Sequence, residues 1–504
     1  MFIRIFSIIP SDFKAHCACE HMFIQRKTGI NMNVSEFKKN GHMIIDWIAN
    51  YFENIEKYPV KSKSSPGEVI SKLPARAPEK AEKFEKIFGD FEKIIMPGIT
   101  HWQSPSFFAY FPANNSFASI LGELLASALG AQCMSWATSP AAAELEEAVM
   151  KQLAKIIGLP ESFCGVIEDT ASTSTLCAAL SAREKYSDYA INSEGFGPEN
   201  KFTAYCSGQA HSSIEKAVKI AGIGKNRLRL IGCDKNYAMI PSEFESAVKK
   251  DIKAGYRPVF AVAAIGTTGS TAIDPLREIG KICKKYKIWL HVDAAYAGSA
   301  LVLPEMRYMI DGIEYADSFV FNPHKWLFTN FDCSAYFVRD KGALIKTFEI
   351  LPEYLKTSEK SAVNNYRDWG IQLGRRFRSL KLWFVLRSFG VSGLRRIIKK
   401  HIELAQYFAE MLAAEKGFEI MAPHPLSVVC FRYKPHKNLS REKTDAFNAD
   451  LLEKLNSSGK LYLSHTRLCG DFVIRMAIGQ TGTEKKHVKS ALNMIINTAK
   501  NMSK

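Results

Sequence analysis

No stretch of the sequence approaches the ~18 to 20 consecutive apolar residues that a membrane-spanning helix requires. Its eleven cysteines contain no CxxC pair and no regular spacing, which argues against a disulfide framework and against a thiolate metal site. Internal repeats, zinc-finger spacing, aromatic RNA-binding signatures and long basic tails are also absent. We therefore expect no membrane span and no metal, and the scattered thiols favour a reducing, cytoplasmic location.

The composition is that of a globular protein with more than one domain. The chain has 504 residues, of which 47% are hydrophobic and 23% charged. Lys and Arg number 67 against 51 Asp and Glu, a net charge of +16 that raises the question of nucleic acid or acidic membranes as partners. The basic residues are scattered, with short clusters such as Arg375, Arg376, Arg378 and Lys381 but no long basic run. We interpret them as a solvated basic surface and expect no nucleic-acid partner.

The first 115 residues divide into an extension and a helical arm. The apolar start of the chain is split by Arg4 and ended by Pro10, so we expect residues 1–31 to be an unstructured extension. An amphipathic helix follows, whose apolar face we expect to be buried on another subunit. That face is formed by Ile44, Trp47, Ile48, Tyr51, Phe52 and Ile55.

From about residue 140 the pattern alternates between helices and short apolar strands, which predicts an α/β fold with a mostly parallel sheet covered by helices on both faces. Helices are predicted at 140–157, 212–222, 275–287 and 376–389, and strands at 202–206, 227–232, 258–265, 288–292, 317–321 and 333–338. A small α+β domain then follows, with helices at 392–415, 440–457 and 484–498 and strands at 427–432 and 472–478. The predicted domains are an arm at 32–115, a large domain at 116–395 and a small C-terminal domain at 396–504.

Three strand ends carry reactive side chains, and ligands bind at such ends in open α/β sheets. Asp293 ends the strand 288–292, Lys325 follows 317–321, and His211 follows 202–206. A desolvated lysine supplies the free amine that an imine requires, and a buried carboxylate calls for a cationic partner such as a protonated pyridine nitrogen. Taken singly, each has a plainer interpretation: a solvated loop lysine, a helix-capping Asp, and a His in the first turn of a helix.

A phosphate site is predicted where residues 169–175, rich in Ser and Thr, precede an apolar helix. Free N–H groups and the helix dipole favour an anion at a helix N-terminus. The alternative is that these hydroxyls only cap the helix.

Five blocks in the same order along the chain now carry a resemblance. They are HWQSPSFFAYFP (101–112), QAHSS (209–213), HVDAAYAG (291–298), FNPHKW (321–326) and LGRRFRSLKLW (373–383). Together they resemble the group II pyridoxal-phosphate decarboxylases, most closely the aromatic L-amino acid decarboxylases that act on tyrosine, DOPA or tryptophan. The likeness runs from about residue 33 to 499. It implies the fold of the aminotransferase-like, fold type I pyridoxal-phosphate enzymes.

The resemblance implies a set of cofactor residues. Lys325 matches the lysine that bonds covalently to pyridoxal phosphate, Asp293 the partner of the pyridine nitrogen, and His211 the histidine stacked on the ring. Ala295 matches the residue beneath the ring, and Thr268 a residue near the cofactor. The other implied cofactor residues, mainly on the phosphate side, are Thr170, Ala171, Ser172, Asn322 and His324.

The substrate side and the proton donor follow by the same likeness. Gly374 matches a position where, in plant relatives, glycine goes with phenolic and serine with indolic substrates. Tyr354 matches a tyrosine on a mobile loop that protonates the α-carbon after decarboxylation; relatives with phenylalanine there tend to release aldehyde. Met134, beside Gln132 and Cys133, corresponds to a pocket residue contributed by the partner subunit. The wall around the substrate side chain corresponds to Trp102, Tyr110, Phe111 and Pro112.

The expected function is decarboxylation of an aromatic L-amino acid to the arylalkylamine, by a homodimer with shared active sites and an arm wrapped around the partner. The alternatives are an aromatic aldehyde synthase, another group II decarboxylase, or a basic binding protein that keeps an inactive fold. The aromatic wall and the lack of an evident carboxylate-binding arginine argue against glutamate as substrate. Asp169 stands where glycine is common in the family, and its charge near a phosphate is unfavourable unless it points away.

Overall fold

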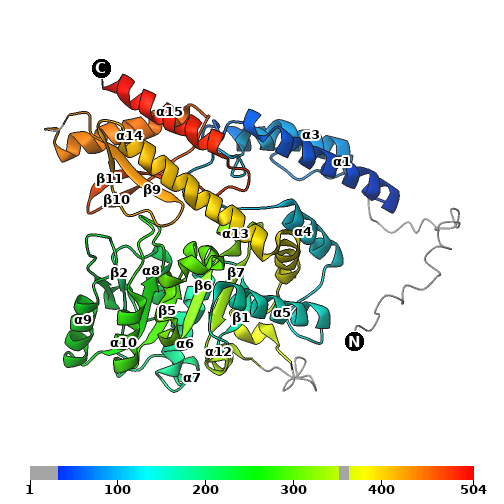
Figure 1. The fold of residues 1–504 in the computed structure, drawn as a ribbon. Coiled ribbons are helices and arrows are strands. Elements are labelled where there is room, and N and C mark those ends of the chain that lie inside the picture. Colours follow the sequence, from blue (N-terminus) through cyan, green and yellow to red (C-terminus); the bar gives the residue numbers. More distant parts are fainter. Residues whose placement is uncertain (1–31, 351–362, 437, 504) are drawn as a thin grey trace, which may run out of the picture. The chain divides into compact units, whose positions relative to one another are not determined.

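The computed structural model describes residues 32–350, 363–436 and 438–503 (Figure 1). The predicted extension 1–31 lies outside this range. Contacts divide the chain into two units, one formed by Met1–Asn54 with Pro66–Met96 and the other by Ile55–Ser65 with Pro97–Lys504. Within the described ranges, every helix is too short or too polar to traverse a bilayer.

The second unit is built on a seven-stranded sheet with the order β1-β7-β6-β5-β4-β2-β3. Its strands are β1 (Cys164–Glu168), β2 (Phe202–Ser207), β3 (Leu228–Ile231), β4 (Arg257–Ala264), β5 (Trp289–Asp293), β6 (Ser318–Phe321) and β7 (Ser334–Val338). The five adjacent strands β3, β2, β4, β5 and β6 are mutually parallel, which confirms the predicted sheet. β7 runs antiparallel to both β6 and β1. β1 was not predicted, because the short CGVIE segment has no clear hydrophobic pattern.

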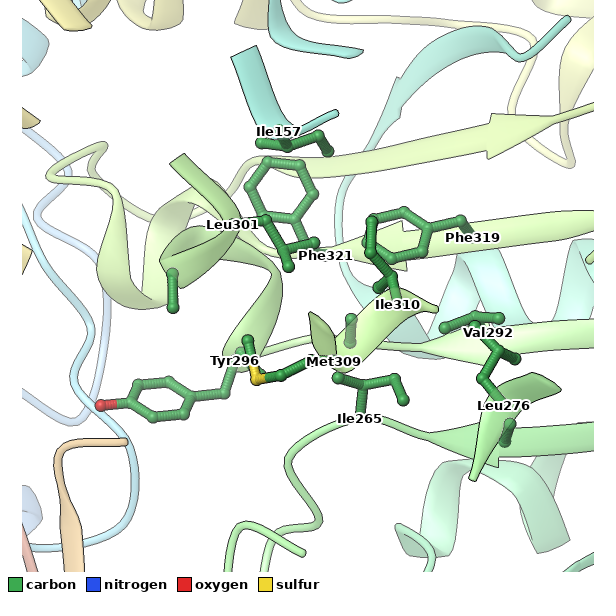
Figure 2. Packing of buried hydrophobic residues seen from close by; sticks show 14 of the residues in the cluster. Ile157, Ile265, Leu276, Val292, Tyr296, Leu301, Met309, Ile310, Phe319 and Phe321 are labelled. Carbon is green, nitrogen blue, oxygen red and sulfur yellow. The ribbon is translucent and has the colours of Figure 1, made fainter. Parts of the chain in front are cut away.

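Helices cover both faces of this sheet, and alternate strand residues supply two core layers. In β4, Ala261 and Ala263 join one layer, whereas Phe260 and Val262 join the other. Figure 2 shows part of the first layer, where Val292 and Phe319 pack with Ile310 and Met309. The first layer contains residues of α5 (Pro140–Ile157), α9 (Pro241–Lys253), α10 (Leu276–Tyr286) and α13 (Arg378–Ala413), and the second those of α6 (Ala171–Lys185), α8 (Ser212–Ile220) and α12 (Lys341–Phe348).

A four-stranded antiparallel sheet forms the core of the C-terminal part, as the α+β prediction requires. Its order is β10-β11-β9-β8, with β8 (Phe418–Ile420), β9 (Val428–Tyr433), β10 (Ser464–Leu468) and β11 (Asp471–Ala477). Its apolar face packs against α14 (Arg441–Ser457), α15 (Lys485–Met502) and the second half of α13. The two helices predicted at 376–389 and 392–415 form one element, α13, with non-helical backbone at Gly390. β8 and the polar β10 were missed.

The remaining elements are short connections and the helices of the first unit. The second unit also holds α4 (Phe117–Leu129), α7 (Ile191–Glu194), α11 (Pro323–Trp326) and 3-10 segments at Ile55–Lys57, Lys225–Arg227, Ala297–Val302, Pro304–Ile310, Ile313–Tyr315 and Tyr366–Trp369. A further 3-10 segment, Met96–Gly98, begins with the last residue of the first unit. The first unit holds α1 (Val34–Glu53), α2 (Glu68–Lys72), α3 (Phe84–Asp90) and the π-helical turn η4 (Phe91–Ile95).

The apolar face of α1 is covered in part by its own chain, and burial of the remainder on another subunit stays a prediction. The Trp47 ring packs edge-on against Phe88 and Phe91, with centroid distances of 6.1 and 5.2 Å. Its indole N–H donates to Glu92 Oε1 at 3.0 Å. The helical segments at 84–95, which carry three phenylalanines, supply this cover. The helical periodicity of residues 44–55 alone could not reveal that a later segment packs on them. Ile45 nevertheless remains exposed.

The basic cluster at 375–381 is not a solvated surface, and that interpretation is wrong for most of its members. The Arg375 guanidinium is buried and forms a bidentate pair with Glu146. Lys381 Nζ is fully buried, 2.8 Å from a Glu123 carboxylate oxygen, and Arg378 bonds Asp332. These cations face acidic residues of α5, of α4 and of the loop before β7, and such pairing cannot be seen in a charge count.

Candidate active site

The three reactive strand ends meet at one cavity of about 230 Å³. It lies at the carboxyl ends of the parallel strands, as expected for an open α/β sheet. All ten residues predicted to hold the cofactor line it: Thr170, Ala171, Ser172, His211, Thr268, Asp293, Ala295, Asn322, His324 and Lys325. Residues that the sequence arguments did not single out also contribute to its wall, among them Ser213, Tyr296 and Phe331.

Lys325 lies in the single turn α11, directly after β6. Burial lowers the pKa of its ammonium group, although the negative charge of Asp293 opposes the shift. Its Nζ is 5.1 Å from the centroid of the Phe111 ring. A lysine in this setting supplies more neutral amine than a solvated one, which makes it a stronger nucleophile.

Asp293 is the last residue of β5 and is buried. Its Oδ1 accepts the Ala295 N–H at 3.0 Å, so the carboxylate is anchored within its own turn. The next helical segment begins at Ala297 with Tyr296 at its N-cap, which argues against the helix-capping alternative for Asp293. The carboxylate therefore faces the cavity with capacity to accept from a cationic donor.

His211 caps α8 and borders the cavity. Its Nδ1 accepts the Ser213 N–H at 3.1 Å and lies 2.8 Å from the Ser213 hydroxyl, so the capping alternative is also correct for this residue. Partial burial lowers the pKa of the imidazole; the Asp293 charge opposes that shift and the Lys325 charge adds to it. Since Nδ1 accepts the Ser213 N–H, the neutral ring carries its proton on Nε2.

His324 and Asn322 are fixed beside Lys325 by the neighbouring strand β7. His324 Nδ1 accepts the Cys333 N–H at 2.9 Å, and burial lowers the pKa of this ring to about 3. Asn322 Oδ1 accepts the Ser334 hydroxyl at 2.7 Å. Both residues are thus neutral and held in one orientation.

The N-terminus of α6 forms the predicted phosphate side. Thr170 is its N-cap, but the Thr170 side chain makes no capping hydrogen bond to the helix. Asp169 does not line the cavity itself, but its Oδ1 accepts the Thr170 N–H at 2.5 Å and the Thr170 hydroxyl at 3.2 Å, so its charge lies beside the N-cap. The first N–H groups of α6, with the dipole behind them, remain a favourable place for an anion.

A second cavity of about 380 Å³ shares Lys325, His211 and Thr268 with the first. The four predicted wall residues, Trp102, Tyr110, Phe111 and Pro112, all line it. The Trp102 and Tyr110 rings are stacked at 5.8 Å, giving one side of the cavity an aromatic surface. Lys325 thus stands between a polar cavity and an aromatic one.

Arg475 also lines the second cavity, and sequence reasoning missed it. Its Nε donates to Gly269 O, its Nη1 donates to Tyr110 O and Ser464 Oγ, and its Nη2 is buried without a partner. The guanidinium packs 5.4 Å from the Phe111 ring centroid. A lone arginine inside the apolar strand DFVIRMA is the signal that could have revealed it.

Two predicted substrate residues lie elsewhere in the chain. Gly374 lines a separate cavity of about 380 Å³ together with Gln132. The Met134 carbonyl accepts the Arg367 N–H, and this methionine lines neither of the cavities beside Lys325. Their assignment to a site contributed by a partner subunit stays a prediction. Tyr354 lies outside the described residues.

Comparison with known proteins decides the family. The pyridoxal-dependent decarboxylase conserved domain matches residues 66–434. The chain belongs to this decarboxylase family. It is a pyridoxal-phosphate-dependent carboxy-lyase, an assignment that sets aside the interpretation as a basic binding protein.

Individual relatives span almost the whole chain. The chain is 45% identical to a phenylacetaldehyde synthase of Petunia hybrida over 491 residues, 94% of this chain and 96% of that one. It is also 45% identical to tyrosine decarboxylase 4 of Petroselinum crispum over 473 residues, covering 91% and 92%. The solved tryptophan decarboxylase of Catharanthus roseus in complex with L-tryptophan has a TM-score of 0.88 and 40% identity, covering 94% of this chain and 100% of that one. The decarboxylase chain therefore has the fold type I architecture predicted for it.

The first cavity fits pyridoxal phosphate. It brings together an amine with a lowered pKa, an anchored carboxylate, an imidazole and a helix N-terminus. These are the groups needed for an aldehyde, a pyridine nitrogen, an aromatic ring and a phosphate. The decarboxylase family and the donor set of the site thus agree.

Proposed function

We propose that the protein decarboxylates an aromatic L-amino acid to the corresponding arylalkylamine and CO2, as a homodimer with shared active sites. The observation that carries this proposal is the position of Lys325 between a cavity with cofactor-binding groups and an aromatic cavity. Tyrosine, DOPA, tryptophan and phenylalanine are the candidate substrates. The decarboxylase relatives named for tyrosine and tryptophan support this class.

Bound pyridoxal phosphate supplies the electron sink that makes loss of CO2 from an α-amino acid feasible. Lys325 is proposed to hold the cofactor through its neutral amine, and Asp293 to keep a positive charge on the pyridine nitrogen. Ala295 would pack beneath the ring, and Ala171, Ser172, Thr268 and Asn322 would line its polar edge.

His211 is proposed to pack on the cofactor ring from the side opposite Ala295. Its Ser213 contacts fix the orientation of the imidazole and leave Nε2–H toward the cavity. The low pKa keeps the ring neutral near pH 7, so it can donate a hydrogen bond without adding a positive charge beside Lys325. The second proposed donor, Tyr354, is assigned only from the sequence: it would deliver a proton to the α-carbon.

The second cavity is proposed to bind the amino acid itself. The stacked Trp102 and Tyr110 rings would contact an aromatic side chain. Arg475, with no carboxylate partner among the described residues, supplies a positive charge that attracts the substrate carboxylate. This arginine removes one of the two sequence arguments against glutamate, whereas the aromatic wall still favours aromatic substrates.

The homodimer is supported by an apolar surface on α4. Phe117, Leu121, Leu124, Leu125 and Leu129 are between 47% and 65% exposed on this one helix. A patch of this kind on a soluble chain is typical of an interface. The cavity that contains Gly374 adjoins α4 through Glu123, Ala126 and Ser127, which supports the proposal that this region completes a site of the partner subunit.

The dimer is tested by light scattering of the wild type and of Leu121→Glu with Leu125→Glu. Dissociation of the variant supports the interface, and an unchanged mass contradicts it. Shared sites are tested by mixing inactive Lys325→Ala with Met134→Arg: recovery of activity on mixing supports them, and its absence argues for self-contained subunits. A cytoplasmic location stays a prediction, tested by fractionation of the source cells.

The reaction is tested with purified protein and pyridoxal phosphate. We expect a visible absorbance band that borohydride abolishes and that Lys325→Ala never forms. Incubation with each of the four amino acids, followed by mass spectrometry, should yield an amine from at least one. A colourless protein, or one that turns over none of them, contradicts the proposal.

The second candidate is an aromatic aldehyde synthase. The Petunia hybrida relative with that name favours it as strongly as the decarboxylase relatives favour the amine product. The same incubation separates the two, because a synthase consumes O2 and releases aldehyde, ammonia and peroxide. The presence of tyrosine rather than phenylalanine at position 354 supports the amine as product.

A further inference from the structure

Asp169 directly precedes the N-cap of α6, on the phosphate side of the cofactor cavity. Thr170, which lines the cavity, gives both of its hydrogen-bond donors to this one carboxylate oxygen. The Thr170 N–H lies 2.5 Å and the Thr170 hydroxyl oxygen 3.2 Å from Asp169 Oδ1.

A threonine has one backbone N–H and one hydroxyl proton, so these donors cannot serve two strong acceptors at full strength. While they are held by Asp169, the Thr170 oxygen offers lone pairs to the cavity. Lone pairs repel a phosphate oxygen, whereas the hydroxyl proton would bind it. Asp169 and a phosphate therefore compete for Thr170.

The charges around Asp169 do not cancel this competition. The nearby cations are paired already: Arg375 with Glu146 and Arg378 with Asp332. The adjacent residue, Glu168, is buried and is itself acidic, so it cannot compensate the charge of Asp169. A dianionic phosphate at the start of α6 thus meets an anion as well as the favourable helix N-terminus.

We propose that Asp169 weakens cofactor binding, because it withholds both Thr170 donors from the phosphate and repels its charge. The inference rests on the proposed use of this cavity for pyridoxal phosphate. A neutral residue at 169 should tighten the cofactor about tenfold, equivalent to about 1.4 kcal/mol. In the wild type, one side chain that touches neither the ring nor the substrate would thus make activity depend more strongly on the cofactor concentration.

The test compares the wild type with Asp169→Ala, which removes both the charge and the oxygen that accepts the two Thr170 donors. Apoenzyme of each is titrated with pyridoxal phosphate, and the dissociation constant is read from absorbance and intrinsic fluorescence. Pyridoxal, which has the same aldehyde and ring but no phosphate, is the matched probe. Glu161→Gln, an exposed carboxylate shortly before β1, controls for loss of one negative charge.

We expect Asp169→Ala to lower the dissociation constant for pyridoxal phosphate about tenfold and to leave that for pyridoxal unchanged. Glu161→Gln should change neither. In addition, Thr170→Val should weaken phosphate binding more in the Asp169→Ala background than in the wild type, because only there does the hydroxyl lack an acceptor at position 169, which leaves it free to bind phosphate.

Equal dissociation constants for wild type and Asp169→Ala overturn the inference, and so does tighter binding of both probes, which indicates a change of the whole site. Weaker phosphate binding in the variant also overturns it, because Asp169 would then orient Thr170 usefully. If Asp169→Ala does not fold, judged by thermal melting of the apoenzyme, Asp169→Gly replaces it. Failure of the wild type to bind either probe would refute the proposed function instead.

Discussion

Substitution of Glu146, the buried partner of Arg375, by leucine should strongly destabilise the protein. The carboxylate accepts three hydrogen bonds: from Arg375 Nη2 at 2.7 Å, Arg375 Nη1 at 3.2 Å and the Ile167 N–H at 2.9 Å. Both side chains of the ion pair are at most 5% exposed. These contacts tie α5 to β1 and to the segment that leads into α13.

The expected cost is set by what the substitution leaves behind. Without Glu146, the Arg375 guanidinium keeps the Ile167 carbonyl, at 2.7 Å, but loses its paired carboxylate. Breaking one side of a buried pair typically costs about 3–5 kcal/mol, because an uncompensated charge remains in the interior. We expect a loss in this range, and a smaller one when Arg375→Met is added, since the orphaned cation is then removed as well.

Urea unfolding of holoenzyme at fixed protein and cofactor concentrations measures this, since both bound cofactor and subunit association shift apparent stability. Glu147→Leu is the matched control, one residue along the same helix. Its carboxylate pairs with Lys151 on the surface and should contribute less than about 1 kcal/mol. A loss below about 1 kcal/mol for Glu146→Leu would refute the assignment of a buried, stabilising pair.

Three further predictions concern pH, product and specificity. Burial is the main cause that raises the pKa of Glu168 from 4.5 to about 7, so between these pH values the folded state keeps a proton that the unfolded state releases. The free energy of unfolding should therefore fall by about 3 kcal/mol as the pH rises from 4.5 to 7. Glu168→Gln should remove this part of the pH dependence, measured by urea unfolding at a series of pH values. Tyr354→Phe should shift the product from amine toward aldehyde and peroxide in a mass-spectrometric assay, and an unchanged amine yield would exclude Tyr354 as the proton donor. Gly374→Ser places a Cβ 3.3 Å from Gln132 Nε2. It should change the ratio of the kcat/KM values for tyrosine and tryptophan by about tenfold, and an unchanged ratio would exclude this position from the specificity pocket.

The sequence predicted the parts of the site that follow from strand order. Asp293, Lys325 and His211 end or follow parallel strands of one sheet, and parallel strands bring their carboxyl ends to one edge. Hydrophobic runs locate such strands well because both faces are buried. The family resemblance added the smaller residues, such as Ala171 and Ala295, whose side chains have no chemical signature of their own.

What the sequence could not supply was pairing between distant segments. β1 joins the sheet only through β7, about 170 residues later, and its short half-buried pattern gives no direction. Cover of Trp47 by Phe88 and Phe91 is equally non-local. Hydrogen bonds of Asp169 depend on a side-chain rotamer, which periodicity does not determine.

Two buried arginines show why a charge count says so little about function. In the sequence, Arg375 lies in a basic cluster and Arg475 stands alone in an apolar strand, yet both side chains are buried. Arg375 is compensated by Glu146, so its charge is accounted for by the fold. Arg475 has no carboxylate within ion-pair distance in the described part of the chain, and its Nη2 has no partner. A buried cation of that kind lowers stability unless an anion joins it, and such a cost is retained where function requires it. Because Arg475 lines the aromatic cavity, the anion that we propose joins it there is the substrate carboxylate, which a net charge of +16 could not have indicated.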